Sequence, residues 1–274
     1  MRWERRRPGG QVSSLVNGSL PAGRWRSREI LTKHLNFCLP ARDFRLGPMN
    51  SAVIVAAGKG TRMGPGMDKL FLEVAGLPVV AHTWRRFDKA DCIDEVVLVV
   101  RDGMQSAFED LAKQFKPSKP YRFAIGGAER QDSVWNGLAA ISPKAEIVAI
   151  QDGARPCTTE QLIAATIQEA METGAAVAGQ PVTDTIKETA DGKTIARNVE
   201  RSKLWAVQTP QTFRVDVIRR ALSEVRSRKL HVTDDTAACE LIGQPVRLVA
   251  SASPNPKVTL PADLPYIELL LAQM

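Results

Sequence analysis

The sequence predicts an α/β protein built on a doubly wound, mostly parallel sheet. Short apolar runs rich in valine and isoleucine alternate with segments of helical spacing along most of the chain, which is the pattern of repeated strand–helix units. The runs are continuous rather than alternating, as in strands that are buried on both faces. One pair of alternating segments, within residues 182–199, has no helix between its members. This pair predicts an antiparallel arm that projects from the sheet.

The elements follow one another in a regular order. We expect strands at 52–57, 95–100, 121–125, 147–150, 175–178 and 246–250. We expect helices at 79–87, 104–115, 132–140, 161–173, 215–226 and 236–242, and a terminal helix that starts near Pro261. Asp132 or Ser133 is the expected cap of the third helix and Thr159 of the fourth, because short polar side chains bond the first free N–H groups of a helix.

The arm is expected over about residues 182–201, with Asp191-Gly192 as its turn. An arm of this kind cannot bury both of its faces against its own sheet. We therefore expect it to pack on a second subunit and to make a homodimer.

A glycine-rich loop follows the first strand. Gly58 and Gly60 allow backbone N–H groups to approach a phosphate closely, and Arg62 and Lys69 add positive charge beside them. The spacing matches neither the dinucleotide-binding fingerprint nor the Walker A loop. The loop predicts triphosphate binding. The alternative is a tight strand-to-helix turn with solvated basic residues.

The charge of the chain is concentrated at its start. The net charge is +7 over 274 residues, and residues 1–48 hold ten basic and three acidic residues, so the remainder is balanced. Residues 49–274 thus offer no net basic field for nucleic acid, and no apolar run is long enough to span a membrane. The four scattered cysteines are typical of reduced thiols in the cytoplasm and do not predict a zinc site.

Residues 1–48 have no periodicity and are interrupted by proline and glycine. Three interpretations remain open: a disordered basic leader, an arginine-rich transit peptide that would direct the protein to a plastid, or translated sequence upstream of the true start at Met49. In each case the folded domain is expected to be 49–274.

Seven motifs in order resemble the 2-C-methyl-D-erythritol 4-phosphate cytidylyltransferase family of isoprenoid biosynthesis. They are Ala56-Ala-Gly-Lys-Gly-Thr-Arg-Met63 with Lys69, Gly126-Gly-x-x-Arg130-x-Asp-Ser-Val134, Asp152-Gly-Ala-Arg-Pro156, Val182-Thr-Asp-Thr-Ile-Lys187, Gln208-Thr-Pro-Gln211, Thr233-Asp234 and Lys257-Val-Thr259. The resemblance implies a Rossmann-like nucleotidyltransferase fold. It also implies transfer of a cytidylyl group from CTP to a polyol phosphate, with Mg²⁺ or another divalent cation bound mainly through the CTP phosphates.

The resemblance also implies roles for individual residues. Arg62 and Lys69 would neutralise charge at the α-phosphorus, and Arg201 and Lys257 would hold the acceptor phosphate. Further substrate contacts are implied at Ala56, Ala57, Gly58, Gly60, Gly127, Arg130, Ser133, Asp152, Arg155, Thr185, Lys187, Thr209, Thr233 and Asp234. Arg201, Thr185 and Lys187 would serve the site of the neighbouring subunit.

Some of these roles stay open. Asp152 either contacts Mg²⁺, binds a substrate hydroxyl or caps its turn, with Arg155 in support. Ser133 either contacts cytosine or caps a helix. Asp68, Ala128 and Gln151 depart from the family's usual proline, aspartate and histidine. Asp68 would either partly neutralise Lys69 or face solvent.

Two alternatives to this function remain at this stage. One is a cytidylyltransferase for ribitol phosphate or another sugar or polyol phosphate. The other is a catalytically silent nucleotide-binding protein on the same fold. The presence of Arg62, Lys69, Arg201 and Lys257 favours an enzyme.

We predict that residues 1–48 are dispensable, because their composition cannot support a core. A chain that starts at Met49 should keep the melting temperature and the turnover of the full chain. A large loss in either measurement would contradict this prediction.

Overall fold

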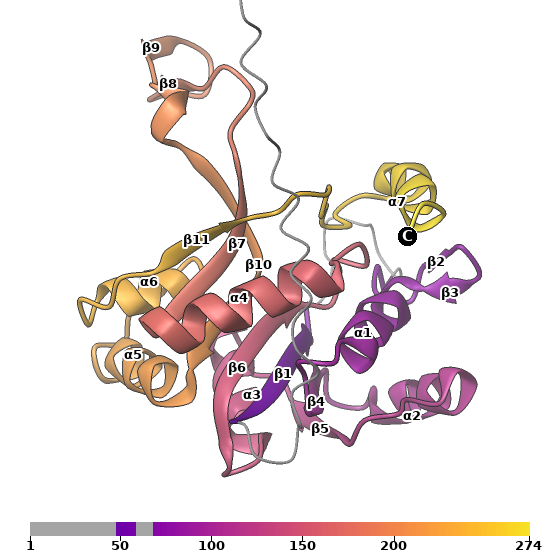
Figure 1. Cartoon of the computed structure of the whole chain (residues 1–274). Helices are drawn as coiled ribbons and strands as arrows, with labels where there is room; N and C mark the ends of the chain where they lie inside the picture. The colour runs from indigo at the N-terminus through magenta and orange to yellow at the C-terminus, as the bar shows by residue number, and fades with distance from the viewer. Residues whose placement is uncertain (1–47, 59–67) are drawn as a thin grey trace, which may run out of the picture. The chain divides into compact units, whose positions relative to one another are not determined.

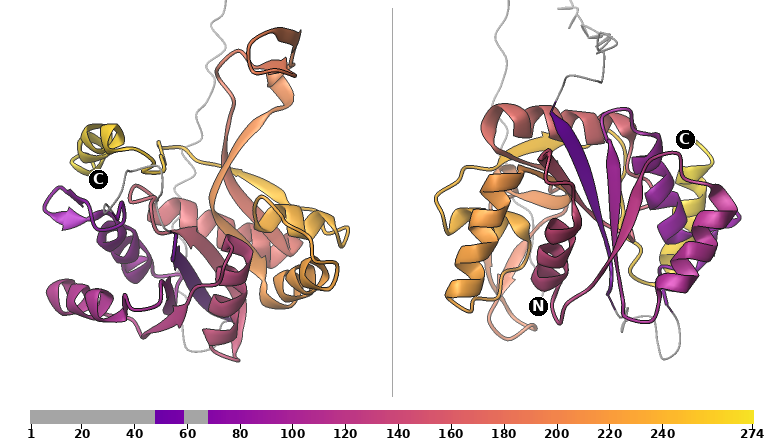
Figure 2. Two further views of the ribbon diagram at one scale, coloured as in Figure 1. Left: turned by 180° about the vertical axis from the view of Figure 1, so that it is seen from behind. Right: turned by 90° about the horizontal axis from the view of Figure 1, so that it is seen from below.

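A computed structural model of the chain describes residues 48–58 and 68–274. Gly60, Arg62 and residues 1–47 of the leader therefore lie outside the described residues. The described chain forms one seven-stranded sheet with helices on both faces (Figures 1 and 2). This confirms the doubly wound, mostly parallel fold. No helix in the described ranges is long and apolar enough to cross a membrane.

The strand order in the sheet is β11-β7-β10-β6-β1-β4-β5. Six strands run in one direction, and β10 is antiparallel to both of its neighbours. The strands are β1 (Met49–Ala56), β4 (Glu95–Val100), β5 (Tyr121–Ile125), β6 (Ala145–Asp152), β7 (Ala175–Pro181), β10 (Trp205–Arg214) and β11 (Arg247–Ala250). A small separate hairpin joins β2 (Glu73–Val74) to β3 (Leu77–Pro78).

Helices cover the two faces of the sheet in two groups. The first group packs into one core cluster and consists of α1 (Val79–Lys89), α2 (Gln105–Phe115), α4 (Glu160–Thr173) and α7 (Leu264–Leu271). The second group packs on the opposite face and consists of α3 (Arg130–Ala140), α5 (Val215–Ser227) and α6 (Asp235–Glu240). Both faces of the central strands are therefore buried, as the continuous apolar runs predicted.

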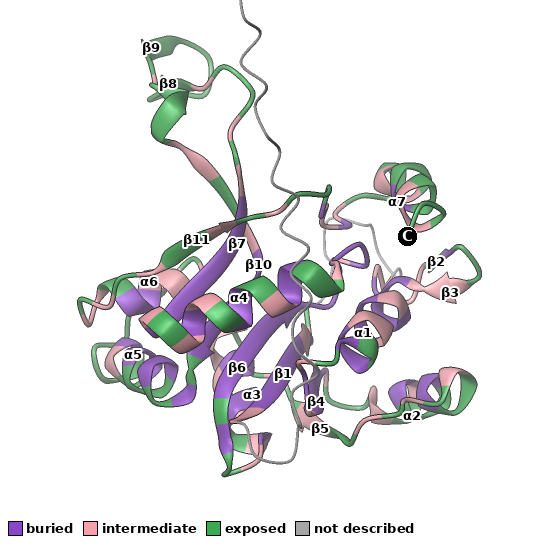
Figure 3. Ribbon diagram, in the orientation of Figure 1, coloured by how far each residue is buried: buried purple, intermediate pink, exposed green. Residues whose placement is uncertain are grey.

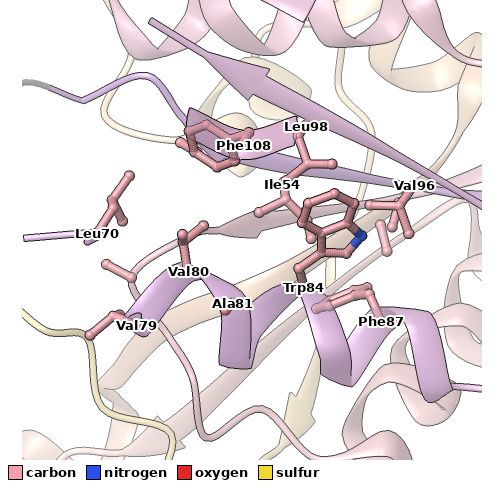
Figure 4. Packing of buried hydrophobic residues seen from close by; sticks show 14 of the residues in the cluster. Ile54, Leu70, Val79, Val80, Ala81, Trp84, Phe87, Val96, Leu98 and Phe108 are labelled. Atoms are coloured by element: carbon pink, nitrogen blue, oxygen red, sulfur yellow. The ribbon is translucent and has the colours of Figure 1, made fainter. Parts of the chain in front are cut away.

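Neighbouring residues of each central strand point to opposite cores. Ile54 of β1 lies in the first cluster, and Val53 lies in the second. In the first cluster the Trp84 side chain of α1 packs among Val96, Leu98 and Ile54 (Figure 4). The strand period of two thus divides one apolar run between two cores.

The arm is present as predicted. β8 (Lys187–Thr189) pairs antiparallel with β9 (Ile195–Asn198) around a turn that contains Gly192. All residues of both strands are exposed, and the hairpin projects beyond the sheet (Figures 1 and 3).

The sequence did not reveal strand β10. Pro210 lies inside it, and a proline normally argues against a central strand because it has no N–H for the ladder. The structure accommodates Pro210 where the register with β7 is interrupted, between Val207 and Gln211. The Thr209–Pro210 peptide bond is cis.

Helix α3 begins earlier than predicted. Its N-cap is Glu129, not Asp132 or Ser133, and Asp132 completes a capping box from the third helical position. The predicted cap of α4 is correct, because the Thr159 hydroxyl accepts a hydrogen bond from Leu162 N at 3.2 Å.

Helix α3 lies very close to the sheet at Gly137, which yields a stability prediction. A Cβ at this position would lie 2.5 Å from Cγ1 of Val53 and 2.8 Å from Cγ2 of Val99. Gly137→Val should therefore lower the free energy of unfolding by about 2–3 kcal/mol through overpacking.

Ala139→Val is the matched control, because Ala139 is an exposed residue of the same helix. Ala139→Val should lower the free energy of unfolding by no more than about 1 kcal/mol, because valine has a lower helix propensity than alanine. Urea denaturation measures both. Equal losses in the two variants would show that the close contact at Gly137 does not constrain the fold.

Candidate active site at the carboxyl edge of the sheet

Three cationic side chains converge on Asp152, the last residue of β6. Its Oδ2 accepts a bond from Lys257 Nζ at 2.7 Å and lies 3.7 Å from Arg155 Nε. Its Oδ1 lies 3.5 Å from Arg130 Nε. The carboxyl ends of the parallel strands meet at this edge, which is where open α/β sheets bind ligands.

The environment of Asp152 keeps it ionised. Burial by itself would raise the pKa of this carboxyl, but Arg130, Lys257 and Arg155 outweigh that effect and hold the pKa at about 2. At neutral pH the buried Asp152 carboxylate is therefore negatively charged, and it lies among cations that the sequence assigned to the site.

Arg130 also bonds a second buried carboxylate, which the sequence reasoning missed. Arg130 Nη1 lies 2.8 Å from Oδ2 of Asp235, a side chain only 1% exposed. Burial raises the pKa of Asp235 against the opposing effect of Arg130. Asp234 caps helix α6 by accepting from Ala237 N at 2.9 Å. The available signal was the acidic pair after Thr233, of which only the first member was considered.

A short segment, residues 255–259, crosses the site and is called the strap below. Val258 N donates to Ala154 O at 2.8 Å, and Val258 O accepts from Lys69 Nζ at 3.2 Å. The carbonyl of Asn255 accepts from Arg155 Nη1 at 2.6 Å. The strap thus brings Lys69 and Arg155 beside its own Lys257.

Thr209 also joins this cluster. Its hydroxyl accepts a hydrogen bond from the backbone N–H of Asp152 at 3.1 Å. Thr209 precedes Pro210 in β10, so the unpredicted antiparallel strand supplies one of the predicted site residues.

The predicted base-contacting residues lie at the ends of β1 and β5. Gly126 has no room for a side chain, because its Cβ would lie 2.3 Å from Cβ of Ala57. Gly127 N donates to the Ser133 hydroxyl at 3.1 Å, and that hydroxyl donates to Glu129 O at 3.1 Å. Ser133 therefore fixes the turn between β5 and α3.

The unusual residues Asp68 and Gln151 have structural partners. Asp68 forms an ion pair with Arg101 and accepts from Leu70 N at 3.1 Å. Asp68 is thus bound to Arg101 and to the backbone rather than facing solvent alone. Gln151 is buried and donates to the Thr158 hydroxyl at 2.8 Å.

The residues expected to act in trans are not in the Asp152 cluster. Arg201 lies in the short helix η2 (Arg201–Lys203), is exposed, and donates to Thr183 O. Lys187 Nζ donates to Asn198 Oδ1 within the arm at 2.9 Å. The described contacts of both side chains stay within the segment that projects from the sheet (Figure 1).

The donor set fits a metal ion carried by a nucleotide better than one held by the protein alone. Within the described ranges, no group of three or more His, Cys, Asp or Glu residues could hold an ion. The Asp152 carboxylate already faces three cations. Mg²⁺ commonly uses one or two carboxylates together with substrate phosphates and water, and Asp152 could supply one such contact once Lys257 moves away.

The structure thus combines a Rossmann-like sheet, a cation cluster at its carboxyl edge and a projecting arm. The model of the family "2-C-methyl-D-erythritol 4-phosphate cytidylyltransferase" matches residues 50–273. The chain belongs to this family, and the resemblance seen in the sequence is confirmed.

Curated relatives and solved structures agree. The chain is 41% identical over 222 residues to the 2-C-methyl-D-erythritol 4-phosphate cytidylyltransferase of Pelotomaculum thermopropionicum, covering 81% of this chain and 93% of that protein. The crystal structure of the Thermus thermophilus enzyme of that name superposes with a TM-score of 0.66 at 31% identity, covering 82% of this chain and all of that one. The crystal structure of a 4-diphosphocytidyl-2C-methyl-D-erythritol synthase from Anaerococcus prevotii superposes with a TM-score of 0.72 at 27% identity. The match covers 82% of this chain and 96% of that one.

The low pKa of Asp152 predicts a pH dependence of stability. Because its folded pKa of about 2 lies below the ordinary 3.8, the contribution is present above the ordinary value and is lost as the pH falls through about 2. This difference between the two pKa values corresponds to about 2 kcal/mol in the free energy of unfolding. Asp152→Asn should therefore be less stable than the parent chain at pH 7, and the gap should narrow between about pH 4 and pH 2.

Thermal unfolding followed over that pH range checks this prediction. The matched control is Asp263→Asn, which also removes a carboxylate that accepts bonds but lies outside the cation cluster. A gap for Asp152→Asn that does not change with pH would contradict the assignment.

Proposed function

We propose that this protein transfers a cytidylyl group from CTP to 2-C-methyl-D-erythritol 4-phosphate, releasing pyrophosphate and forming the CDP-methylerythritol intermediate of isoprenoid biosynthesis. The observation that carries the proposal is the Asp152 cluster with its strap, at the edge of a sheet that belongs to this family. The cysteine pattern favours a cytoplasmic location.

Both reactants are anions, so the reaction needs positive charge at fixed places. An oxygen of the acceptor phosphate attacks the α-phosphorus of CTP, the new P–O bond forms, and the bond to pyrophosphate breaks. Lys69 stabilises charge that develops at the α-phosphorus and on pyrophosphate. Lys257 orients the acceptor phosphate, and it exchanges its bond to Asp152 for one to that phosphate.

Mg²⁺, or another divalent cation, accompanies CTP in this proposal. When bound, it supplies charge neutralisation at the triphosphate. Asp152 is the residue that would hold it, and the same carboxylate would otherwise bind a substrate hydroxyl. Arg130 and Arg155 keep Asp152 ionised for either role.

We also propose that the arm makes a homodimer and completes the site of the partner with Arg201, Thr185 and Lys187. Support comes from the exposure of the arm, where the Ile195 side chain is 64% exposed. A hairpin with both faces exposed is marginally stable alone and gains from burial against a second subunit.

The direct test is a pyrophosphate-release assay with CTP, ATP, GTP and UTP, each crossed with methylerythritol phosphate, ribitol phosphate and erythritol phosphate. Turnover should require CTP and methylerythritol phosphate. Faster turnover with another acceptor would show that the protein acts on a different polyol phosphate. Absence of turnover with every pair would indicate a catalytically silent nucleotide-binding protein.

Lys69 should act on the transition state more than on bound CTP. Charge grows at the α-phosphorus only during the reaction, so Lys69→Ala should lower kcat about a hundredfold and change the CTP dissociation constant by less than about tenfold. Single-turnover rates and calorimetry measure the two quantities. Arg62→Ala should behave alike, although Arg62 lies outside the described residues.

Lys113→Ala is the control for this prediction, because Lys113 is an exposed lysine of α2. It should change neither quantity. If CTP affinity falls as far as the rate in Lys69→Ala, Lys69 binds ground state and transition state equally.

Shared sites predict complementation between inactive variants. In a mixed dimer, Lys69→Ala on one subunit and Arg201→Ala on the other impair the same site, which leaves the second site intact. Equal mixing with subunit exchange should restore about a quarter of the parent activity, since half of the dimers are mixed. Absence of recovery, with exchange verified by mass spectrometry, would show that Arg201 does not act in trans.

A further inference from the structure

Asn255 ties the strap to two other segments through its side chain. Its Nδ2 donates to Thr209 O at 2.8 Å, and its Oδ1 accepts from the Thr158 hydroxyl at 3.0 Å. The residue is only 2% exposed. These directional bonds join the strap to β10 and to the turn that follows Asp152.

The backbone of the strap is fixed on both sides of Lys257. Before it, the carbonyl of Asn255 accepts from Arg155, and Pro256 restricts the next backbone angle. After it, Val258 is fully buried and its N–H bonds Ala154 O. Lys257 is thus a flexible side chain on a firmly held piece of backbone.

The position of that backbone decides where the ammonium group can reach. The lysine stem has four rotatable carbon–carbon bonds and little intrinsic preference for one geometry. A displacement of about 1 Å in a positioning group can cost about a hundredfold in rate. A residue that fixes the strap therefore acts on the placement of Lys257.

We propose that Asn255 is a positioning residue that holds Lys257 for the acceptor phosphate. This inference rests on the proposed cytidylyl transfer. An amide side chain is required because it carries both a donor and an acceptor. The NH₂ group of Asn255 donates to a carbonyl, and its oxygen accepts from a hydroxyl. A carboxylate of the same shape would keep the second bond but would set oxygen against Thr209 O.

The test compares Asn255→Asp, Lys257→Ala and the double variant by steady-state kinetics and by calorimetry with CTP. Asn255→Asp should raise the acceptor KM at least about tenfold and leave the CTP dissociation constant within about threefold. In the Lys257→Ala background it should change the acceptor KM by less than about twofold, because no lysine is left to position.

The matched control is Asn50→Asp. Asn50 is also buried and also donates from Nδ2 to a carbonyl, that of Cys92 at 2.9 Å, but it lies at the start of β1. This substitution should lower the melting temperature without changing the acceptor KM. Effects of Asn255→Asp and Lys257→Ala that simply multiply, or an equal loss of CTP affinity, would overturn the proposal.

A second measurement does not depend on the reaction. The rate at which an N-hydroxysuccinimide ester labels Lys257, followed by mass spectrometry, should rise at least about threefold in Asn255→Asp as the strap loosens. The rate at exposed Lys113 should stay unchanged. If the parent chain shows no turnover, the proposed function fails, and this labelling alone decides the role of Asn255; an unchanged rate at Lys257 overturns it.

Thr158→Val replaces Asn255→Asp if the latter does not fold. It removes the hydroxyl that bonds Asn255 and Gln151 and keeps the shape of the side chain. The acceptor KM and the labelling of Lys257 should change in the same direction by a smaller factor. No change in either would equally overturn the proposal.

Discussion

Cations that are brought close enough to act on two phosphates repel one another when no substrate is present. Arg130, Arg155 and Lys257 all face the Asp152 carboxylate at the carboxyl edge of the sheet, and Asp235 adds a second negative charge beside Arg130. Asp152 is buried as the last residue of a central strand, where a lone charge would be costly. The cations and the carboxylate therefore stabilise one another. This mutual stabilisation explains how the cluster can form before any substrate binds.

The remaining parts of the site are arranged around that cluster. Asp235 holds the far side of Arg130, so this arginine links helix α6 to β6. The strap receives bonds from Lys69 and Arg155 through its carbonyls and presents Lys257 between them. Residues from separate parts of the chain thus meet at this cluster. Within the described residues, no group of three or more His, Cys, Asp or Glu residues could hold a metal ion there. Loss of one bond should affect several neighbours.

Much of the fold was predictable because the central strands are buried on both faces, and their continuous apolar runs are visible in the sequence. Asp152 was predictable for the same reason, since it closely follows such a run and ends β6. Strand β10 was not, because Pro210 conceals it and its pairing with β7 is interrupted there. The start of α3 was misplaced because Glu129, a less usual cap, precedes two better ones.

Long-range partners were beyond the reach of sequence patterns. The pair of Asp68 with Arg101 and that of Arg130 with Asp235 join residues that are distant along the chain. Asn255 carries no catalytic signal of its own, and only its hydrogen bonds reveal its place. The arm illustrates the opposite case, since its alternating pattern and turn are local and were identified correctly.

The central claim is that the Asp152 cluster is a resting arrangement of the residues that bind the two phosphates. A crystal structure with CTP, Mg²⁺ and methylerythritol phosphate, under conditions that prevent turnover, tests it most directly. The account predicts that Lys257 Nζ leaves Asp152 and lies about 3 Å from an acceptor phosphate oxygen, with the strap backbone unmoved. An acceptor phosphate bound away from the strap, with the Lys257–Asp152 pair intact, would contradict it.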